Sequence, residues 1–317
     1  MAALLAPVVP TVLWSRRADV AEDVSAGRGN RRYLDGYPLP SELEATDDLA
    51  VAVGGADLLV VGVPTHGFRH TLESAAAAVG SRTPVISLAK GFERSTGLRM
   101  SQVAAEVLPG RPVGVLTGPN LAREILEGRS AATVIAATDP AAASALQGLL
   151  ASDRFRVYTN EDLVGCELGG ALKNVIALAA GMAEGLDTGD NARAALITRG
   201  LAEMTRLGVA LGGAPMTFAG LAGMGDVMAT CMSSQSRNRW VGEQVGRGAA
   251  PDRVLAGMDQ VAEGVRTATV ACELAASVAM EVPVAEGVRS VFDDGRSPSE
   301  VWSALMARRT GPEVATT

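Results

Sequence analysis

Short apolar runs alternate with amphipathic stretches through the first half of the chain. Runs rich in Val, Leu and Ile predict buried strands at residues 11–14, 58–63, 84–88, 113–116 and 133–137. Helix-like stretches separate several of these runs, notably at residues 68–79 and 100–107. This alternation predicts βαβ units and a doubly wound, Rossmann-like parallel sheet with helices on both faces.

From about residue 161 the pattern indicates helices alone. The periodicity predicts helices at residues 163–184, 192–211, 236–245, 254–258 and 267–278. A chain of 317 residues is also longer than one typical domain. We therefore predict an α/β domain over residues 1–160 and an all-α domain over residues 161–317.

The amino-acid composition argues against some classes of binding partner. Hydrophobic residues make up 48% of the chain and charged residues 20%, as in ordinary soluble globular proteins. The net charge of −7 and the aromatic content of 3% make nucleic acids and anionic membranes poor partners. The apolar first 14 residues lack a basic start and contain two prolines, so we expect no signal peptide. No run of about 18 uncharged apolar residues occurs, and we expect no membrane span.

Cysteine and histidine usage argues against a metal site. Cys166, Cys231 and Cys272 show no CxxC or zinc-ligand spacing, which is typical of reduced thiols in a cytosolic protein. With only two histidines, a multi-His metal site is nearly excluded. His66 and His70 are four residues apart, and we expect them on a helix surface rather than in catalysis.

A lysine inside an apolar helix is the most informative feature. Lys173 lies in the segment GGALKNVI at residues 169–176, where burying a charge is costly. A lone lysine would snorkel to the surface. Here Asn174 is adjacent, and Gly169 and Gly170 permit close approach of a ligand or backbone. A partly desolvated lysine has a lowered pKa and exchanges protons near neutrality, which is the functional interpretation.

Two further segments carry candidate chemistry in the second half. The Gly-rich segment 220–226 ends at Asp226 and precedes Thr230; it is either a tight loop facing a site or a capped helix start. Ser236 and Arg237 begin the segment SRNR at the start of a predicted helix. A helix N-terminus with an arginine binds phosphate groups well. The alternative is a capping serine followed by solvated charges.

Polar turns follow three of the predicted strands, at residues 61–66, 88–91 and 118–122. In an open parallel sheet, ligands bind beyond the carboxyl ends of the strands. These three turns therefore predict one crevice, in which Lys90 would neutralise a phosphate or bind a carbonyl oxygen.

Together these segments resemble the bacterial NAD(P)-dependent glycerol-3-phosphate dehydrogenases from about residue 12 to residue 307. The most specific segments are GGALKNVIALAAGM at 169–182, GDNARAALITRGLAEM at 189–204, GLAGMGD at 220–226 and SRNR at 236–239. Supporting segments are LWSRR at 13–17, VGVPTH at 61–66, SLAKGFE at 87–93 and GPNLAREI at 118–125.

The resemblance implies reduction of dihydroxyacetone phosphate to sn-glycerol 3-phosphate with NADPH or NADH, for phospholipid synthesis. Lys173 would donate the proton to the substrate carbonyl. The other implied substrate-binding residues are Lys90, Gly118, Asn120, Asp226, Ser236, Arg237 and Asn238, with Asn174 and Thr230 as neighbours. The implied cofactor-binding residues are Arg16, Arg17, Tyr33, Lys90, Ala122, Arg237, Val261 and Glu263. Arginine after the second strand favours the 2′-phosphate, and hence NADPH.

The chain departs from the family at its start. The family begins with a strand and a GxGxxG turn that meets the cofactor pyrophosphate, and no such motif lies near Met1. We expect the central strand of the sheet to be missing, with the loss of roughly twenty residues. Either the start is assigned too far downstream and the protein is a normal enzyme, or the chain is a damaged or repurposed relative with weak cofactor binding.

Two rival functions remain open at this point. Another hydroxy-acid dehydrogenase with the same two-domain plan would also carry a Lys-Asn helix, although the SRNR segment suits a phosphate better than a carboxylate. A non-catalytic nucleotide- or metabolite-binding protein would keep its function in Lys173→Ala, whereas an enzyme would lose turnover. We expect a cytoplasmic protein, and the Ala- and Met-rich helical half predicts a homodimer.

Overall fold

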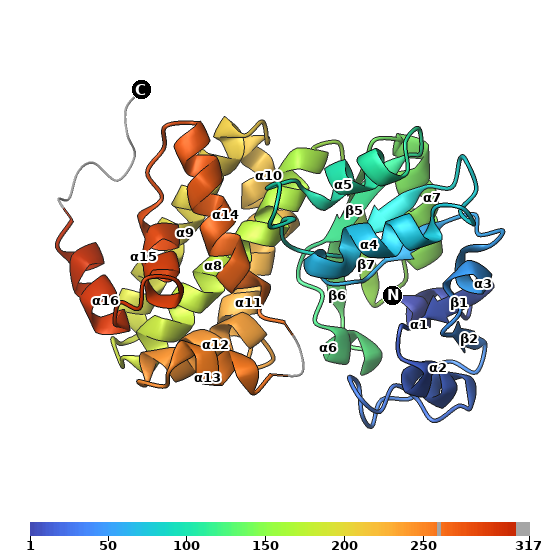
Figure 1. Cartoon of the computed structure of the whole chain (residues 1–317), viewed down its shortest axis with the longest axis horizontal. Coiled ribbons are helices and arrows are strands. Elements are labelled where there is room, and N and C mark those ends of the chain that lie inside the picture. The colour runs from blue at the N-terminus through green and yellow to red at the C-terminus, as the bar shows by residue number, and fades with distance from the viewer. Residues whose placement is uncertain (259–260, 309–317) are drawn as a thin grey trace. The chain divides into compact units, whose positions relative to one another are not determined.

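The computed structural model describes residues 1–258 and 261–308, which form two compact units (Figure 1). The α/β unit contains Met1–Gly170 and Gly208–Asp226, and the helical unit contains Ala171–Leu207 and Val227–Thr317. The helices α8 (Leu163–Gly185) and α9 (Asp190–Ala210) contribute residues to both units. An α/β part followed by an all-helical part is therefore confirmed, while the boundary near residue 160 stays a prediction.

The α/β unit is built on a five-stranded sheet. Its strands follow each other in the order β3 (Leu59–Val61), β4 (Val85–Ser87), β5 (Val113–Thr117), β6 (Ala131–Ala137) and β7 (Phe155–Asn160). The pairs β3–β4, β4–β5 and β6–β7 are parallel, but β5 and β6 are antiparallel. The expectation of a purely parallel sheet is therefore wrong at this one pair, because the connection between β5 and β6 reverses the chain direction.

Helices cover both faces of this sheet, as the apolar runs predict. Successive residues of a strand point to opposite faces. Val85 accordingly packs with α4 (Thr65–Ala75) and α5 (Met100–Val107), whereas Ile86 packs with α7 (Pro140–Leu150) and α1 (Ala2–Leu5). The two histidines lie exposed on α4, which confirms their surface position.

A second, smaller sheet precedes the five-stranded one. Strand β1 (Thr11–Trp14) pairs in parallel with β2 (Leu43–Thr46), flanked by α2 (Ala18–Ser25) and α3 (Leu49–Val53). In the part of the chain that the structure describes, neither β1 nor β2 pairs with the larger sheet. The two sheets are thus separate, with unjoined edges at β1 and β3.

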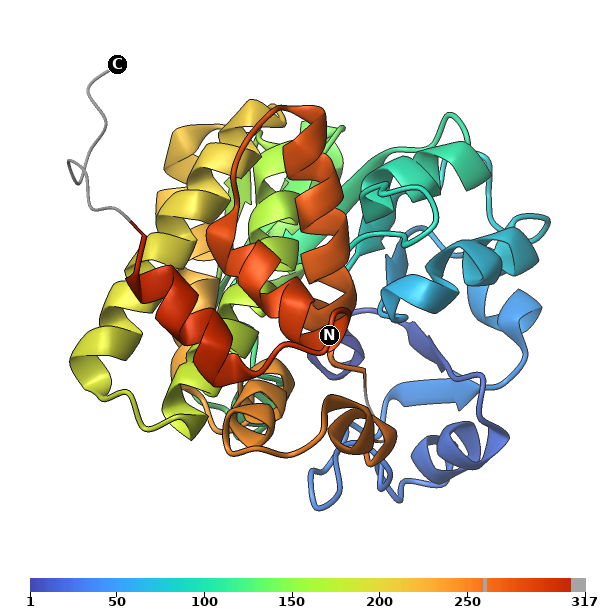
Figure 2. The same cartoon turned by 60° about the vertical axis from the view of Figure 1, so that its left-hand side comes forward.

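Helices alone make up the helical unit within residues 171–207, 227–258 and 261–308. Besides α8 and α9 they are α11 (Asp226–Met232), α12 (Arg237–Gly246), α13 (Pro251–Ala256), α14 (Glu263–Ser277), α15 (Pro283–Phe292) and α16 (Pro298–Met306). Helix α14 packs against α15, and α15 against α16 (Figure 2). The short α10 (Pro215–Ala219) and the π-helical turn Leu221–Gly225 belong to the α/β unit.

Helix α8 is the core helix of the fold. It is long and apolar enough to cross a membrane, yet 89% of its most apolar 18-residue window is buried inside the protein. Burial on this scale is typical of the central helix of a soluble protein. Every residue from 165 to 183 is buried, so any polar group on this helix needs a partner in the protein.

Glycines bring the backbones of α8 and α12 into contact. A Cβ atom on Gly242 would lie 2.1 Å from the carbonyl oxygen of Leu178, and one on Gly246 would lie 2.4 Å from that of Met182. On α8, Gly181 meets the carbonyl of Arg239 in the same way. Small residues at such spacing allow the close approach of two helices. The position of α12 on α8 is therefore tightly fixed.

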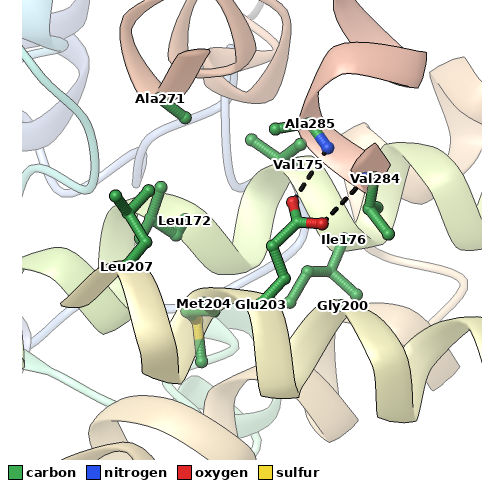
Figure 3. Close-up of a pocket in the computed structure, with 10 residues that line it drawn as sticks. All are labelled: Leu172, Val175, Ile176, Gly200, Glu203, Met204, Leu207, Ala271, Val284 and Ala285. Atoms are coloured by element: carbon green, nitrogen blue, oxygen red, sulfur yellow. Dashed lines mark hydrogen bonds between the residues drawn. The ribbon is translucent and has the colours of Figure 1, made fainter. Parts of the chain in front are cut away.

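A buried carboxylate fixes α15 in the helical unit. Glu203 on α9 is only 6% exposed, and its carboxylate accepts hydrogen bonds from the backbone N–H groups of Val284, at 2.8 Å, and Ala285, at 3.0 Å (Figure 3). These donors belong to the first turn of α15, which lacks intrahelical partners for them. Burial raises the pKa of Glu203 to about 7, although the two hydrogen bonds oppose this rise.

Glu203 should make stability depend on pH. Its pKa is higher in the folded protein than in the unfolded chain, so between about pH 4.5 and pH 7 the folded state retains a proton that the unfolded chain has lost. The free energy of unfolding should therefore fall as pH rises through this window, by about 1.4 kcal/mol for each unit of pKa difference. Urea unfolding of the wild type and Glu203→Gln from pH 5 to pH 8 measures this, and the wild type should lose stability relative to the variant. Parallel profiles, like those expected for the exposed control Glu273→Gln, would contradict it.

Candidate functional site

Lys173 is buried and held by a hydroxyl group. It is 7% exposed, and its Nζ donates a hydrogen bond to Oγ1 of Thr230 on α11 at 2.5 Å. The snorkelling alternative is therefore wrong, because the side chain stays inside the protein. Thr230 is itself 5% exposed. The structure thus places an amine at a fixed position on the core helix.

The neighbouring asparagines connect three helices. Nδ2 of Asn238 on α12 donates to Oδ1 of Asn174 on α8 at 2.9 Å, and Oδ1 of Asn238 accepts from the N–H of Gly264 on α14 at 3.0 Å. A Cβ atom at position 264 would lie 2.5 Å from the carbonyl oxygen of Asn174, so glycine is required there. Asn238 was predicted to bind substrate; one of its amide N–H groups and one lone pair of its oxygen already have protein partners, which leaves one N–H and one lone pair for a ligand.

The start of α12 has the features of an anion site. Ser236 is the N-cap, and its Oγ accepts from the N–H of Arg239 at 3.2 Å. Arg237, the first helical residue, is exposed to solvent. Desolvation by the surrounding protein lowers the pKa of its guanidinium, and the Glu263 carboxylate opposes that change. An exposed arginine at a helix N-terminus suits a phosphate.

In the α/β unit, two predicted residues contact a second lysine, Lys90. Nζ of Lys90, which follows β4, donates to the carbonyl oxygen of Gly118 at 2.7 Å and to Oδ2 of Asp226 at 2.5 Å. Asp226 is 2% exposed, so its charge needs this ion pair. Gly118 has φ 113°, a conformation that favours glycine.

Asn120 lies in the connection that reverses the chain after β5. Its Nδ2 donates to Oγ1 of Thr133 at 3.0 Å, and Thr133 in turn donates to the carbonyl oxygen of Thr117 at 2.7 Å. Asn120 therefore stabilises the antiparallel pair β5–β6 as well as being a predicted substrate residue. Its buried Oδ1 has no hydrogen-bond partner within the described residues.

The two lysine clusters share one structural element. Asp226, the partner of Lys90, begins α11, and Thr230, the partner of Lys173, lies one turn later in the same helix. The chain contains 28 lysines and arginines in all, of which only Lys90 and Lys173 are lysines. This count is a signal that motif reasoning missed: each of the two lysines of the chain has a buried or partly buried polar partner, Lys90 in the α/β unit and Lys173 in the helical unit.

The predicted cofactor residues lie on four segments. Arg16 and Arg17 come one residue after the end of β1. Arg16 is exposed, and Arg17 forms an ion pair with Asp19 at 2.9 Å. Tyr33 is half-buried in the segment after α2. Ala122 begins α6 (Ala122–Leu126), while Val261 and Glu263 precede and begin α14.

The residues after β1 suit the adenosine end of a dinucleotide better than its pyrophosphate. The exposed guanidinium of Arg16 at the carboxyl end of β1 suits a phosphate on the adenosine ribose. The first glycine of the sequence is Gly27, which lies after β1.

Glu167 is a further buried charged residue with several partners, and the motifs in the sequence did not indicate it. Glu167 on α8 is 7% exposed and accepts from the N–H of Ser101 at 2.8 Å, from its Oγ at 2.5 Å, and from Arg99. It fixes the start of α5 against α8. Like Lys173, Glu167 is a charged residue within an apolar helix, and this pattern in the sequence could have indicated its structural role.

An α/β unit followed by a helical unit with a buried lysine agrees with the dehydrogenase architecture that the sequence resembles. Profiles described as NAD-dependent glycerol-3-phosphate dehydrogenase N-terminus and C-terminus match residues 1–143 and 162–303. A glycerol-3-phosphate dehydrogenase [NAD(P)+] 2 from Sphingopyxis alaskensis is 51% identical over 314 residues, covering 99% of this chain and 94% of the relative. One from Mycobacterium avium is 48% identical over 306 residues, covering 96% and 90%.

A solved structure agrees with the sequence comparisons. The crystal structure of glycerol-3-phosphate dehydrogenase from Coxiella burnetii matches with a TM-score of 0.93 and 34% identity, covering 97% of this chain and 94% of that one. This chain belongs to the NAD-dependent glycerol-3-phosphate dehydrogenase family. It is thus an oxidoreductase of a family that uses NAD(P)H, which disfavours the non-catalytic alternative. The coverage of the relatives does not support the expected truncation.

Proposed function

We propose that this chain reduces dihydroxyacetone phosphate to sn-glycerol 3-phosphate with NAD(P)H. The observation that carries the proposal is the buried amine of Lys173, held at 2.5 Å by Thr230 on the core of the fold. The names of the relatives, glycerol-3-phosphate dehydrogenase [NAD(P)+], support the same substrate.

Lys173 protonates the substrate oxygen in the proposed reaction. The nicotinamide, when bound, supplies the hydride to the carbonyl carbon. Negative charge then develops on the carbonyl oxygen, and a positioned ammonium group stabilises this charge and donates a proton to it. Thr230 restricts the motion of the amine, so less orientation has to be gained at the transition state.

The remaining residues bind and orient the substrate. The N–H groups at the start of α12, with Ser236 and Arg237, hold the phosphate. Binding energy gained at the phosphate, remote from the reacting carbon, then contributes to orientation. A second set of polar groups in the α/β unit is formed by Lys90, Gly118, Asn120 and Asp226. The amine of Lys90 is already oriented there by two acceptors. Asn238 contributes through the amide N–H that does not donate to Asn174.

Substrate preference tests this function against a hydroxy-acid dehydrogenase. We expect the purified chain to oxidise NADPH with dihydroxyacetone phosphate, much more slowly with dihydroxyacetone, and not with 2-oxo acids. Initial rates measured from NADPH absorbance give kcat/KM for each compound. A higher kcat/KM for any 2-oxo acid would reject the proposed substrate.

We propose NADPH as the preferred reductant because arginine follows β1. The Arg16→Ala variant should raise KM for NADPH by about tenfold or more, since a charge-assisted hydrogen bond contributes ~1.5–3 kcal/mol. KM for NADH should change little, because NADH lacks the 2′-phosphate. Steady-state kinetics with both cofactors make the comparison, and equal changes for the two would contradict a 2′-phosphate contact.

Two finer proposals concern assembly and localisation. The exposed side chains of Met228 and Met232, which are 51% and 76% exposed, support a homodimer through the helical unit. We place the enzyme in the cytoplasm, where its product supplies glycerophospholipid synthesis.

A further inference from the structure

The two arginines of the SRNR segment have different surroundings. Arg237 is exposed, whereas the side chain of Arg239 is only 12% exposed. Residues two apart on a helix do not face the same side. If Arg237 holds a phosphate, Arg239 on the other side of α12 needs a different role.

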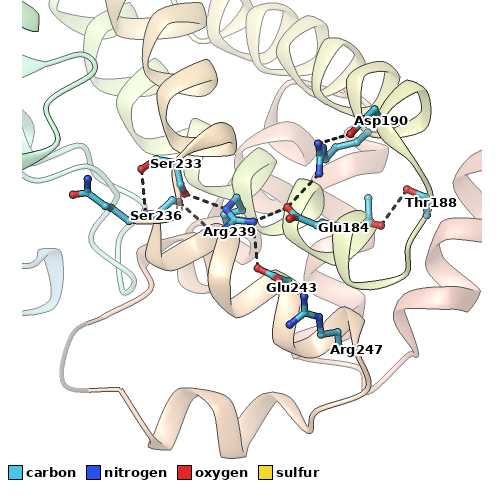
Figure 4. Close-up of polar contacts among 11 residues, drawn as sticks. Glu184, Thr188, Asp190, Ser233, Ser236, Arg239, Glu243 and Arg247 are labelled. Atoms are coloured by element: carbon cyan, nitrogen blue, oxygen red, sulfur yellow. Dashed lines mark hydrogen bonds and ion pairs between the residues drawn. The ribbon is translucent and has the colours of Figure 1, made fainter. Parts of the chain in front are cut away.

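The Arg239 guanidinium contacts two carboxylates and one backbone carbonyl oxygen (Figure 4). Nη1 donates to Oε2 of Glu184 on α8 at 2.6 Å and to Oε2 of Glu243 on α12 at 3.2 Å. Nε donates to the carbonyl oxygen of Ser233 at 3.1 Å. The side chain therefore links the end of α8, the body of α12 and the loop between α11 and α12.

Arg239 also holds the N-cap of α12 through its backbone. Its N–H donates to Oγ of Ser236, while its side chain holds Ser233 at the other end of the same short loop. One residue thus fixes both ends of the loop that leads to Arg237. The backbone contact between α8 and α12 at Gly181, Gly242 and Gly246 leaves the helix body little freedom, so the loop and first turn are what Arg239 controls.

We propose that Arg239 is a positioning residue for substrate binding. It fixes the first turn of α12 relative to α8, which also carries Lys173, so that the phosphate and the reacting carbonyl meet their partners together. The proposal rests on the proposed phosphate-binding role of Arg237. A displacement of about 1 Å in such a geometry lowers activity by up to ~100-fold.

The charged side chains around Arg239 determine which substitution can test its positioning role. Glu184 is also within 3.4 Å of Arg193, and Glu243 within 2.5 Å of Arg247. Removing Arg239 altogether would take a shared partner from the carboxylates of Glu184 and the buried Glu243, which risks the fold of the variant. Arg239→Lys keeps the charge but loses the planar group that reaches three acceptors at once.

The experiment compares Arg239→Lys with Arg247→Ala, a control whose side chain is 60% exposed and, among the described residues, forms an ion pair only with Glu243. We expect Arg239→Lys to raise KM for dihydroxyacetone phosphate by about tenfold or more, with Tm within about 3 °C of the wild type. KM for NADPH, and kcat/KM for the phosphate-free dihydroxyacetone, should stay within about twofold. Arg247→Ala should change none of these values.

Two results would overturn the positioning role. One is an Arg239→Lys variant with an unchanged KM for dihydroxyacetone phosphate while Arg237→Ala raises it; the phosphate site then stands and the positioning role fails. The other is an equal loss of activity with both substrates together with a lowered Tm, which is the behaviour of a purely structural residue. If Arg237→Ala itself leaves KM unchanged, the phosphate-binding proposal fails, and the positioning role fails with it.

Discussion

Lys173→Met should lower kcat for dihydroxyacetone phosphate by about 10²- to 10⁴-fold, the range that positioned proton donors contribute. Methionine fills a similar volume in the buried environment of α8 but offers no proton. KM for NADPH should stay within about twofold, because the cofactor residues are unchanged. Single-turnover reduction with NADPH in excess measures the chemical step directly.

A rescue experiment separates lost chemistry from a damaged fold. Lys173→Ala leaves space beside Thr230, and a small primary amine such as methylamine should restore part of the rate in this variant but not in Lys173→Met. Circular dichroism and Tm establish that both variants fold. A Lys173→Met enzyme with a kcat within threefold of the wild type would contradict the assignment of Lys173 as the proton donor.

Arg237→Ala should raise KM for dihydroxyacetone phosphate by about 10- to 100-fold, because a charge-assisted contact contributes ~1.5–3 kcal/mol. The effect should vanish with dihydroxyacetone, which has no phosphate to lose. Arg253→Ala, an exposed arginine on the neighbouring helix α13, serves as the matched control and should leave both substrates unaffected. An equal change of KM for the two substrates would show that Arg237 does not contact the phosphate.

Much of the fold follows from periodicity in the sequence. Strand β1 and helix α5 occur at the predicted residues, and the core helix α8 within one residue of its predicted end. Strand β7 was missed although its residues alternate between buried and exposed over much of its length, a pattern typical of a half-covered strand. Strand β2 was missed because its four residues include only one buried side chain.

Strand direction and long-range contacts are what the sequence did not reveal. Apolar runs look alike in parallel and antiparallel pairs, so the reversal between β5 and β6 gave no signal. The ion pair between Lys90 and Asp226 joins residues 136 positions apart, and only the family resemblance brought them together beforehand. Likewise, the letters SRNR do not tell which arginine is buried, because that depends on Glu184 on another helix.

The most direct test of the account is to incubate the purified chain with dihydroxyacetone phosphate and NADPH and to quantify the product against the cofactor consumed. The account predicts one sn-glycerol 3-phosphate formed for each NADPH oxidised, with no oxidation when the substrate is omitted. A folded chain that binds NADPH but forms no sn-glycerol 3-phosphate would contradict the claim that these two lysine clusters make a working glycerol-3-phosphate dehydrogenase.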